Sequence, residues 1–279
     1  MIYKAYKFLN KSFQRIINNF GGKKLKPRKI KVGPLRGFYY YGNYAEGRYF
    51  NNFEKDMVDF LSSRIKNRIK EGFIIYDIGA CLGFYSLLFA KLIRGNGKVY
   101  SFEPNYSIFE RLLLNIKLNN FGSSIVPLNI ALGEKKTRGE LVVLPNNVGR
   151  STLHPALKNQ YKSTDKFIQK VNIECADNLN IPRPDFVKID VEGFETNVLM
   201  GMLGILSKNA PDLFIEIHGV GKSGKEETLK KVLSILQNYG YYCINIEHNY
   251  YFEGFNSNIP LEGHLYASVD RQHILDSLK

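Results

Sequence analysis

The sequence predicts an α/β protein built on a doubly wound, mostly parallel sheet of seven strands, the last of them antiparallel. Short apolar segments alternate along the chain with amphipathic segments of helical length, which is the pattern of successive βαβ units. Several of the apolar segments end in an acidic residue, and parallel strands bring such ends to one edge of a sheet. The strands are expected at 73–78, 98–103, 125–132, 185–190, 213–218, 241–247 and 264–270.

The first apolar strand runs into a glycine-containing turn, from Asp77 through Gly79 and Ala80 to Gly83. Glycines at such a turn permit a ligand to approach the backbone and the next helix to pack closely. The free amide groups at the helix start would face that ligand. Cys81 stands where the dinucleotide pattern G-x-G-x-x-G requires its second glycine, so a ligand without a pyrophosphate, such as S-adenosylmethionine (SAM), is expected at these residues. The alternative is an ordinary strand–turn–helix of any α/β protein.

A second acid follows the glycine turn by about 20 residues, where doubly wound sheets place the carboxylate that binds both ribose hydroxyls. This residue is Glu103, and Pro104 ends its strand because proline cannot continue the hydrogen-bonded ladder. Asn129 lies at the next strand end and is expected beside the adenine ring. The alternative interpretation of Glu103 is an exposed acid at a strand end.

The next two strands carry the candidate catalytic residues. Asp190 and Glu192 end one strand, and Glu216 and His218 end the next. A hydroxyl becomes a good nucleophile only when it loses its proton, so Asp190, Glu192 and His218 are candidate general bases, with Asp190 also expected near the cofactor. Neighbouring carboxylates raise one another's pKa, which suits a base. For Glu195 we favour a simpler role as a favourable charge at a helix N-terminus.

Two alternatives remain open for these residues. Asp190, Glu192 and Glu216 would together offer the oxygen ligands that Mg²⁺ prefers, so a magnesium ion is a second possible cofactor beside SAM. His218 could instead be a hydrogen-bonded histidine at a strand end. The histidines show no metal-ligand spacing, and no residue is assigned to a metal site.

The sequence resembles the FkbM family of SAM-dependent methyltransferases over roughly residues 46–220. The resemblance implies a class I methyltransferase (Rossmann-like) fold and transfer of a methyl group to a hydroxyl, often on sugars or secondary metabolites. Family members commonly carry Asn where this chain has Cys81. The matching residues are Asp77 to Ala80, Gly83 to Ser86, Phe102 to Pro104, Lys188 to Gly193, Glu195, Val198, Leu199, Gly201, Glu216 and His218.

The net charge of +13 is concentrated at the start of the 279-residue chain. Residues 1–45 contain 11 basic residues and no acidic one, whereas residues 73–279 contain 22 basic and 21 acidic residues. The core is therefore close to neutral, and the basic segment predicts a local anionic partner. The 3 cysteines are scattered without a disulfide or metal pattern, and no signal peptide or membrane span is evident, so a cytoplasmic location is expected.

Residues 1–50 are expected to form a basic amphipathic extension, and residues 51–279 the methyltransferase domain. Residues 1–20 have a helical pattern with basic and apolar faces, followed by a basic linker, a hairpin at 37–44 and a helix at 51–70. Residues 1–31 could associate peripherally with an anionic membrane, or the helix could pack on the core. Residues 133–176 are an inserted excursion expected over the active site.

The function favoured by these observations is transfer of a methyl group from SAM to a hydroxyl of a small molecule or glycan. An RNA methyltransferase that uses the basic arm is one alternative. The nearly neutral core argues against this alternative, because RNA-binding proteins usually interleave basic and aromatic residues around their site. A non-catalytic SAM-fold module tethered to a membrane or complex is another. The acceptor, the methylated atom and the oligomeric state do not follow from the sequence.

Overall fold

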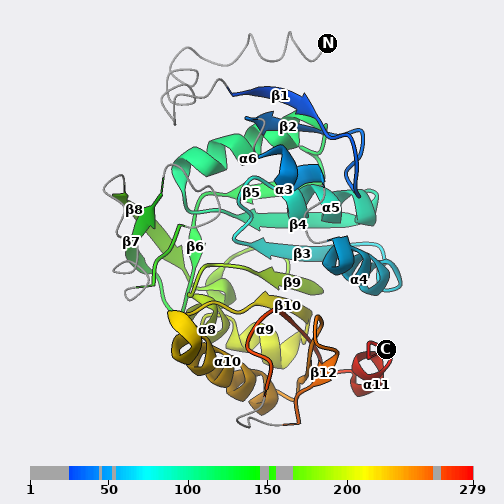
Figure 1. Cartoon of the computed structure of the whole chain (residues 1–279), viewed down its shortest axis with the longest axis vertical. Helices are drawn as coiled ribbons and strands as arrows, with labels where there is room; N and C mark the ends of the chain where they lie inside the picture. Colours follow the sequence, from blue (N-terminus) through cyan, green and yellow to red (C-terminus); the bar gives the residue numbers. More distant parts are fainter. Residues whose placement is uncertain are drawn as a thin grey trace.

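The computed structural model describes residues 25–43, 46–51, 55–144, 151–154, 166–253 and 259–278. The helix predicted for residues 1–20 lies outside this part of the chain. A ladder of strands runs through the middle of the molecule, with helices packed against it (Figure 1). No helix in the described ranges is both long and apolar enough to cross a membrane.

The central sheet has eight strands in the order β12-β11-β13-β10-β9-β3-β4-β5. The pairs from β5 to β10 are parallel, and β13 is antiparallel to both of its neighbours, as predicted. The two-residue strand β12 makes the sheet one strand wider than expected, because two residues are too few to produce a sequence pattern. The bounds are β3 (Phe73–Ile78), β4 (Gly97–Phe102), β5 (Ile125–Leu128), β9 (Phe186–Ile189), β10 (Asp212–Glu216), β11 (Tyr242–Asn245), β12 (Tyr250–Tyr251) and β13 (His264–Ser268).

Both faces of this sheet are covered. All six residues of β3 are buried, and they alternate between two hydrophobic clusters: Phe73 and Ile75 join one, and Ile74, Tyr76 and Ile78 join the other. This explains why the parallel strands appear in the sequence as continuous apolar runs. The first cluster lies against α4 (Lys55–Lys66), α5 (Phe84–Ile93), α6 (Tyr106–Leu118) and α11 (Arg271–Leu275), the second against α8 (Glu195–Met200), α9 (Leu203–Lys208) and α10 (Gly221–Asn238).

The N-terminal hairpin differs from its prediction. Its strands are β1 (Lys26–Lys29) and β2 (Tyr39–Gly42), paired antiparallel, so the first strand lies in the segment expected to be a basic linker. The predicted hairpin at 37–44 contained only the second strand, because the connecting loop is longer than a tight turn. The hairpin packs on α6, where Asn115 and Asn119 accept hydrogen bonds from the amides of Tyr41 (2.6 Å) and Tyr39 (2.8 Å).

The segment before the central sheet contains two described helices. A helix was predicted at 51–70; the structure has α3 (Gly47–Asn51), which begins earlier, and α4 (Lys55–Lys66), which ends earlier, and residues 52–54 lie outside the described part of the chain. Asn51 accepts hydrogen bonds from the amides of Lys31 (2.8 Å) and Val32 (3.2 Å), which attaches α3 to the hairpin loop. Residues 25–43 are thus fastened to the core. The division into domains at residue 50 stays a prediction.

A second sheet combines two strands of the predicted excursion at 133–176 with a short strand that precedes it. Its strands are β6 (Ala131–Leu132), β7 (Thr137–Val143) and β8 (Phe167–Glu174), in the order β6-β8-β7. The strand predicted at 125–132 is therefore split at Asn129 and Ile130, because β5 and β6 belong to different sheets. The small sheet is tied to the end of β4, where the Gln169 amide donates to the Pro104 carbonyl oxygen at 3.0 Å. The short 3₁₀-helix η1 (Ala176–Asn178) then leads toward β9.

Candidate active site

The glycine turn after β3 is shaped by the protein's own packing. Gly79 has a φ of 77°, and a Cβ built on it would lie 1.8 Å from the backbone oxygen of Asp190. A Cβ on Gly83 would lie 2.5 Å from a side-chain carbon of Leu112 on α6. The amides of Gly79 and Ala80 both donate to the Phe102 oxygen at 3.0 Å, so they are already paired. These three residues therefore set the position of the turn, and their predicted contact with the cofactor stays a prediction.

Cys81 adopts a left-handed backbone conformation, with a φ of 50°. Among residues with a side chain, Asn accepts this conformation most readily, so the conformation fits the Asn that the family resemblance led us to expect here. Burial, followed by the nearby charge of Glu103, raises the pKa of the Cys81 thiol to about 12. The thiol is therefore neutral, and the residue contributes through its backbone amide.

Glu103 lies directly after β4, where its buried carboxylate is held by two backbone amides. The Cys81 amide donates to Oε2 at 2.9 Å and the Asn105 amide to Oε1 at 2.8 Å. Each oxygen keeps a second lone pair, as the two hydroxyls of a ribose would require. Burial raises the pKa of Glu103 to about 7, although these two hydrogen bonds oppose the rise. The predicted role of Glu103 thus has a fitting geometry.

Asn129 secures the same segment. Its Nδ2 donates to the backbone oxygens of Glu103 at 2.8 Å and Pro104 at 3.2 Å. The side-chain amide is therefore engaged with the chain that follows β4. Asn105 then begins α6 as its N-cap, accepting from the amide of Ser107 at 3.2 Å.

Asp77 lies beneath the glycine turn and is fully buried. Its Oδ2 accepts a hydrogen bond from Ser86 at 2.5 Å, and its Oδ1 lies 3.4 Å from the ammonium of Lys188. The sequence suggested that this carboxylate serves a ligand directly. In the structure the carboxylate faces these internal partners below the turn, and its predicted role in binding the cofactor stays a prediction.

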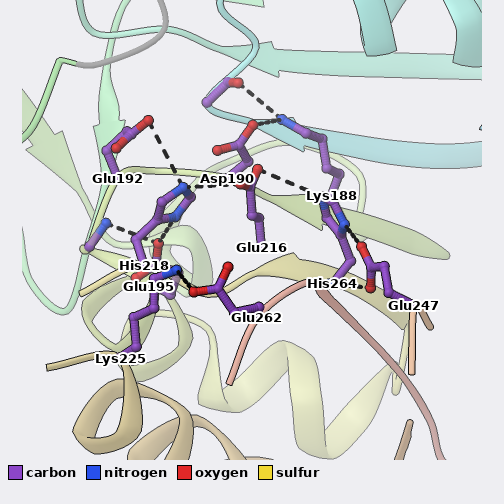
Figure 2. A network of polar contacts seen from close by, with 12 residues as sticks. Lys188, Asp190, Glu192, Glu195, Glu216, His218, Lys225, Glu247, Glu262 and His264 are labelled. Atoms are coloured by element: carbon purple, nitrogen blue, oxygen red, sulfur yellow. Dashed lines mark hydrogen bonds and ion pairs between the residues drawn. The ribbon is translucent and has the colours of Figure 1, made fainter. Parts of the chain in front are cut away.

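His218 lies among three carboxylates at the carboxyl ends of β9 and β10 (Figure 2). Its Nδ1 is 2.8 Å from Glu195 Oε1, and its Nε2 is 3.3 Å from Glu216 Oε1 and 3.9 Å from Glu192 Oε1. Burial lowers the pKa of the imidazole, but the bonds with Glu195 and Glu216 outweigh it and raise the pKa to about 12. His218 is therefore an imidazolium at neutral pH and has no lone pair with which to act as a base.

Glu195 is the buried partner of His218, which the sequence interpretation missed. Its Oε1 also accepts the Gly193 amide at 3.0 Å, and its Oε2 has no hydrogen-bond partner among the described residues. We had favoured a simple role for Glu195 as a charge at a helix N-terminus, and α8 does begin at this residue. That explanation was incomplete, because the side chain turns toward His218. Only the spacing to His218 on the neighbouring strand could have indicated this contact.

His264 and Glu247 extend the same network from the far side of β10. His264 pairs with Glu216 in the β10–β13 register, and its Nε2 lies 3.7 Å from Glu216 Oε2. Its Nδ1 is 2.5 Å from Glu247 Oε1, and its ring stacks on Phe214 at 4.8 Å. Burial raises the pKa of Glu216, but its bonds to the two histidines prevail and lower it. The sequence could have indicated His264 if the predicted antiparallel last strand had been aligned with β10, because that register places His264 beside Glu216.

Among the described residues, the side chains close enough together to hold a divalent cation are a different trio from the one predicted. One ligand atom each of Asp190, Glu216 and His218 lies within 4.8 Å of the others, whereas the prediction grouped Glu192 with the two acids. As an imidazolium, His218 would have to release its proton before it could bind an ion. These residues therefore fit a network in which the proton on His218 balances the carboxylate charges better than they fit a dedicated Mg²⁺ site.

The excursion contacts Glu192 after β9 and Asn105 after β4. Thr152 is buried, and its hydroxyl donates to the backbone oxygen of Glu192 at 2.6 Å. Glu192 itself has a φ of 52°, a strained conformation for a residue with a side chain. Asn105 Nδ2 donates to Ser151 Oγ at 3.1 Å. The excursion therefore touches both the predicted cofactor side and the predicted catalytic side of the sheet edge.

The strand order, the antiparallel β13 and the acidic residues at the carboxyl ends of β3, β4 and β9 define the class of protein as a class I methyltransferase fold. A family model described as "Methyltransferase FkbM domain" matches residues 77–243, which is more than half of the chain. The chain belongs to the FkbM methyltransferase family.

Curated relatives are named as methyltransferases. The chain is 28% identical over 181 residues to "Hexuronic acid methyltransferase AglP" of Haloferax volcanii, which covers 65% of this chain and 68% of that protein. It is 29% identical over 157 residues to "Methyltransferase sdnD" of Sordaria araneosa, covering 46% of this chain and 60% of that protein. The match thus spans less than two thirds of the Sordaria protein.

A solved structure of an FkbM methyltransferase from Methylobacillus flagellatus KT is also similar, with a TM-score of 0.46 at 20% sequence identity. The match covers 70% of this chain and 43% of that one.

Proposed function

We propose that this chain transfers a methyl group from SAM to a hydroxyl of a glycan or another small polyhydroxylated molecule. The observation that carries the proposal is the arrangement at one sheet edge: Glu103, with two lone pairs available for ribose hydroxyls, lies on the same edge as the carboxylates of Asp190 and Glu192. The name of the Haloferax relative, which specifies a hexuronic acid, supports a sugar as the acceptor.

SAM supplies an electrophilic methyl group, whose bond to sulfur breaks as the acceptor oxygen bonds to carbon; the sulfur keeps the electron pair. The protein's own task is to orient the acceptor and to take its hydroxyl proton. Asp190 and Glu192 are the remaining candidates for that base, because His218 already carries its proton. His218 instead attracts the surrounding carboxylates and fixes their positions.

An RNA methyltransferase remains the second candidate function, and the observation that favours it is the basic N-terminal segment. The nearly equal numbers of basic and acidic residues in 73–279 do not support a phosphate-binding surface around the site. For residues 1–31 we propose contact with an anionic membrane surface, in keeping with a cytoplasmic protein that acts on a lipid-linked sugar. Their basic residues and the predicted apolar face support this.

Cofactor binding is tested by calorimetric titration with S-adenosylhomocysteine (SAH), the demethylated product. Glu103→Ala removes both ribose acceptors and should weaken binding by about 1.5–3 kcal/mol, the usual value of hydrogen bonds to a charged group. Glu140→Ala is the matched control, because Glu140 lies on β7 of the small sheet and is exposed. Unchanged SAH affinity in Glu103→Ala, or no binding by the wild type, would remove the cofactor assignment.

A further inference from the structure

Lys188 is a buried lysine in the middle of the central sheet. It lies on β9, between β3 and β10, and only 3% of its side chain is exposed. Lysine is almost never buried without a partner, because removing an ammonium group from water is costly. The position therefore requires groups that compensate the charge, and their identity indicates what the lysine does.

Within the described part of the chain, the polar contacts of this ammonium are with residues at the proposed active site. Its Nζ lies 3.2 Å from Asp190 Oδ2 and 3.4 Å from Asp77 Oδ1, and it donates to the backbone oxygen of Gly79 at 3.1 Å. It also lies 5.1 Å from the centre of the Tyr85 ring on α5. Figure 2 shows the side chain turned toward Asp190, away from Glu247 and His264.

The sheet register explains these contacts. Lys188 pairs with Asp77 across the parallel β3–β9 ladder, so the two side chains leave the sheet on the same face, under the glycine turn. Gly79 and Asp190 then meet above them, where the missing Cβ of Gly79 allows the two backbones to touch. One ammonium thus connects the end of β3 with the end of β9. Burial lowers the pKa of Lys188, but Asp190 and Asp77 outweigh it and raise the pKa, so the charge is retained.

We propose that Lys188 is a positioning residue that holds Asp190 and the Gly79 turn in the arrangement needed to bind the cofactor and to receive the acceptor. The inference rests on the proposed function of this site. Lys188 acts through Asp190, since its ammonium is enclosed by protein groups and does not itself meet a substrate.

The test separates this role from a merely structural one by removing the buried ion pair of Lys188 and Asp77 as a unit. In Lys188→Met with Asp77→Asn, the two fully buried charges are removed together and only Asp190, whose side chain is 26% exposed, loses a partner, so the fold should persist even if Lys188→Met alone is too unstable to purify. The matched control is Asp212→Asn. Asp212 is a buried acid at the other end of β10, paired with Arg68 and Tyr266 and remote from the edge that carries Asp190.

SAH affinity is measured by calorimetry and the melting temperature by circular dichroism. We expect the double variant to remain folded but to bind SAH about ten-fold or more weakly, and Asp212→Asn to melt earlier but to keep its affinity. Adding Asp190→Asn to the double variant should then weaken binding by much less than it does in the wild type, because coupled residues are not additive.

Wild-type affinity in the folded double variant would overturn the role of Lys188 and leave the proposed function intact. Full additivity with Asp190→Asn would also overturn it, because Lys188 would then not act through Asp190. No SAH binding by the wild-type protein would instead overturn the proposed function, and this inference with it.

Discussion

Glu103 gives the clearest pH dependence of any single side chain. Its pKa near 7 means that it loses the charge that ribose hydroxyls favour as the pH falls through neutrality. We therefore expect SAH affinity to be highest above about pH 8 and to decrease toward about pH 6, measured by calorimetry across that range. Glu103→Gln should bind weakly at every pH. If the variant keeps the pH dependence of the wild type, another group is responsible for it.

His218 gives a prediction about stability. Its pKa is near 12 in the folded protein against an ordinary value of 6.5, so the folded state holds the proton more tightly than the unfolded state. Its stabilising contribution is complete below about pH 6.5 and is lost as the pH rises toward the folded-state pKa. We expect the melting temperature of the wild type to exceed that of His218→Asn by a margin that shrinks from about pH 6.5 to pH 10. A margin that grows with pH would contradict the imidazolium assignment.

Among the elements, the turn after β3 supports a sharp comparison of two glycines. Gly79→Ala places a Cβ against the Asp190 backbone, which must move, so both the melting temperature and SAH affinity should fall. Gly122→Ala adds a Cβ with nothing within 4 Å and should change neither. Thermal melting and SAH titration of both variants test this. Equal behaviour of the two would show that β9 does not constrain the turn.

The excursion can be tested through Thr152, whose hydroxyl binds the Glu192 carbonyl. Thr152→Val removes that bond from a buried side chain to the half-buried Glu192 carbonyl, which costs about 1–3 kcal/mol. Because Glu192 is a candidate base, turnover should fall while SAH affinity remains. Thr137→Val, on an exposed position of β7, is the control. Loss of SAH affinity together with turnover would mean that the excursion supports the whole edge and not the base alone.

The elements themselves were predicted to different degrees. The glycine turn and the acids of β3, β4 and β9 follow from local sequence, because an apolar strand that ends in a polar residue is visible in a short window. The β1–β2 hairpin was misplaced because Lys26 to Lys29 resembles a linker, and its pairing depends on Asn115 and Asn119 of α6. The split of β5 from β6 was missed for the same reason: it is decided by a partner strand distant in the sequence.

For the molecule as a whole, the mostly parallel sheet and its antiparallel last strand were predictable, since connection rules leave few topologies for this alternation. The charge state of the site was not. The imidazolium of His218 depends on Glu195, Glu216 and Asp190 converging from different elements, and the ammonium of Lys188 on Asp190 and Asp77. Candidate residues can be read from strand ends, but their protonation depends on distances between strands.

The N-terminal segment gives a prediction about the whole chain. A variant that begins at Leu25 keeps the β1–β2 hairpin, which packs on α6, and removes the predicted amphipathic helix. We expect the full chain to sediment with anionic vesicles and the variant not to, because each basic residue near such a surface contributes about 1 kcal/mol. Replacing Lys4, Lys7, Lys11 and Arg15 by Gln in the full chain should have a similar effect. Equal sedimentation of all three proteins would exclude the membrane role.

The central claim, methyl transfer from SAM to a sugar hydroxyl, is tested most directly by following a labelled methyl group. The full chain is incubated with labelled SAM and a panel of hexuronic acids, neutral hexoses, lipid-linked sugars and RNA oligonucleotides, with Asp190→Asn as the control and with chelator or added Mg²⁺ in parallel. We expect label on a hydroxyl oxygen of one sugar class, one SAH released per methyl transferred, loss of transfer in Asp190→Asn, and no dependence on Mg²⁺. Label on RNA alone, or transfer that Asp190→Asn leaves unchanged, would contradict the account.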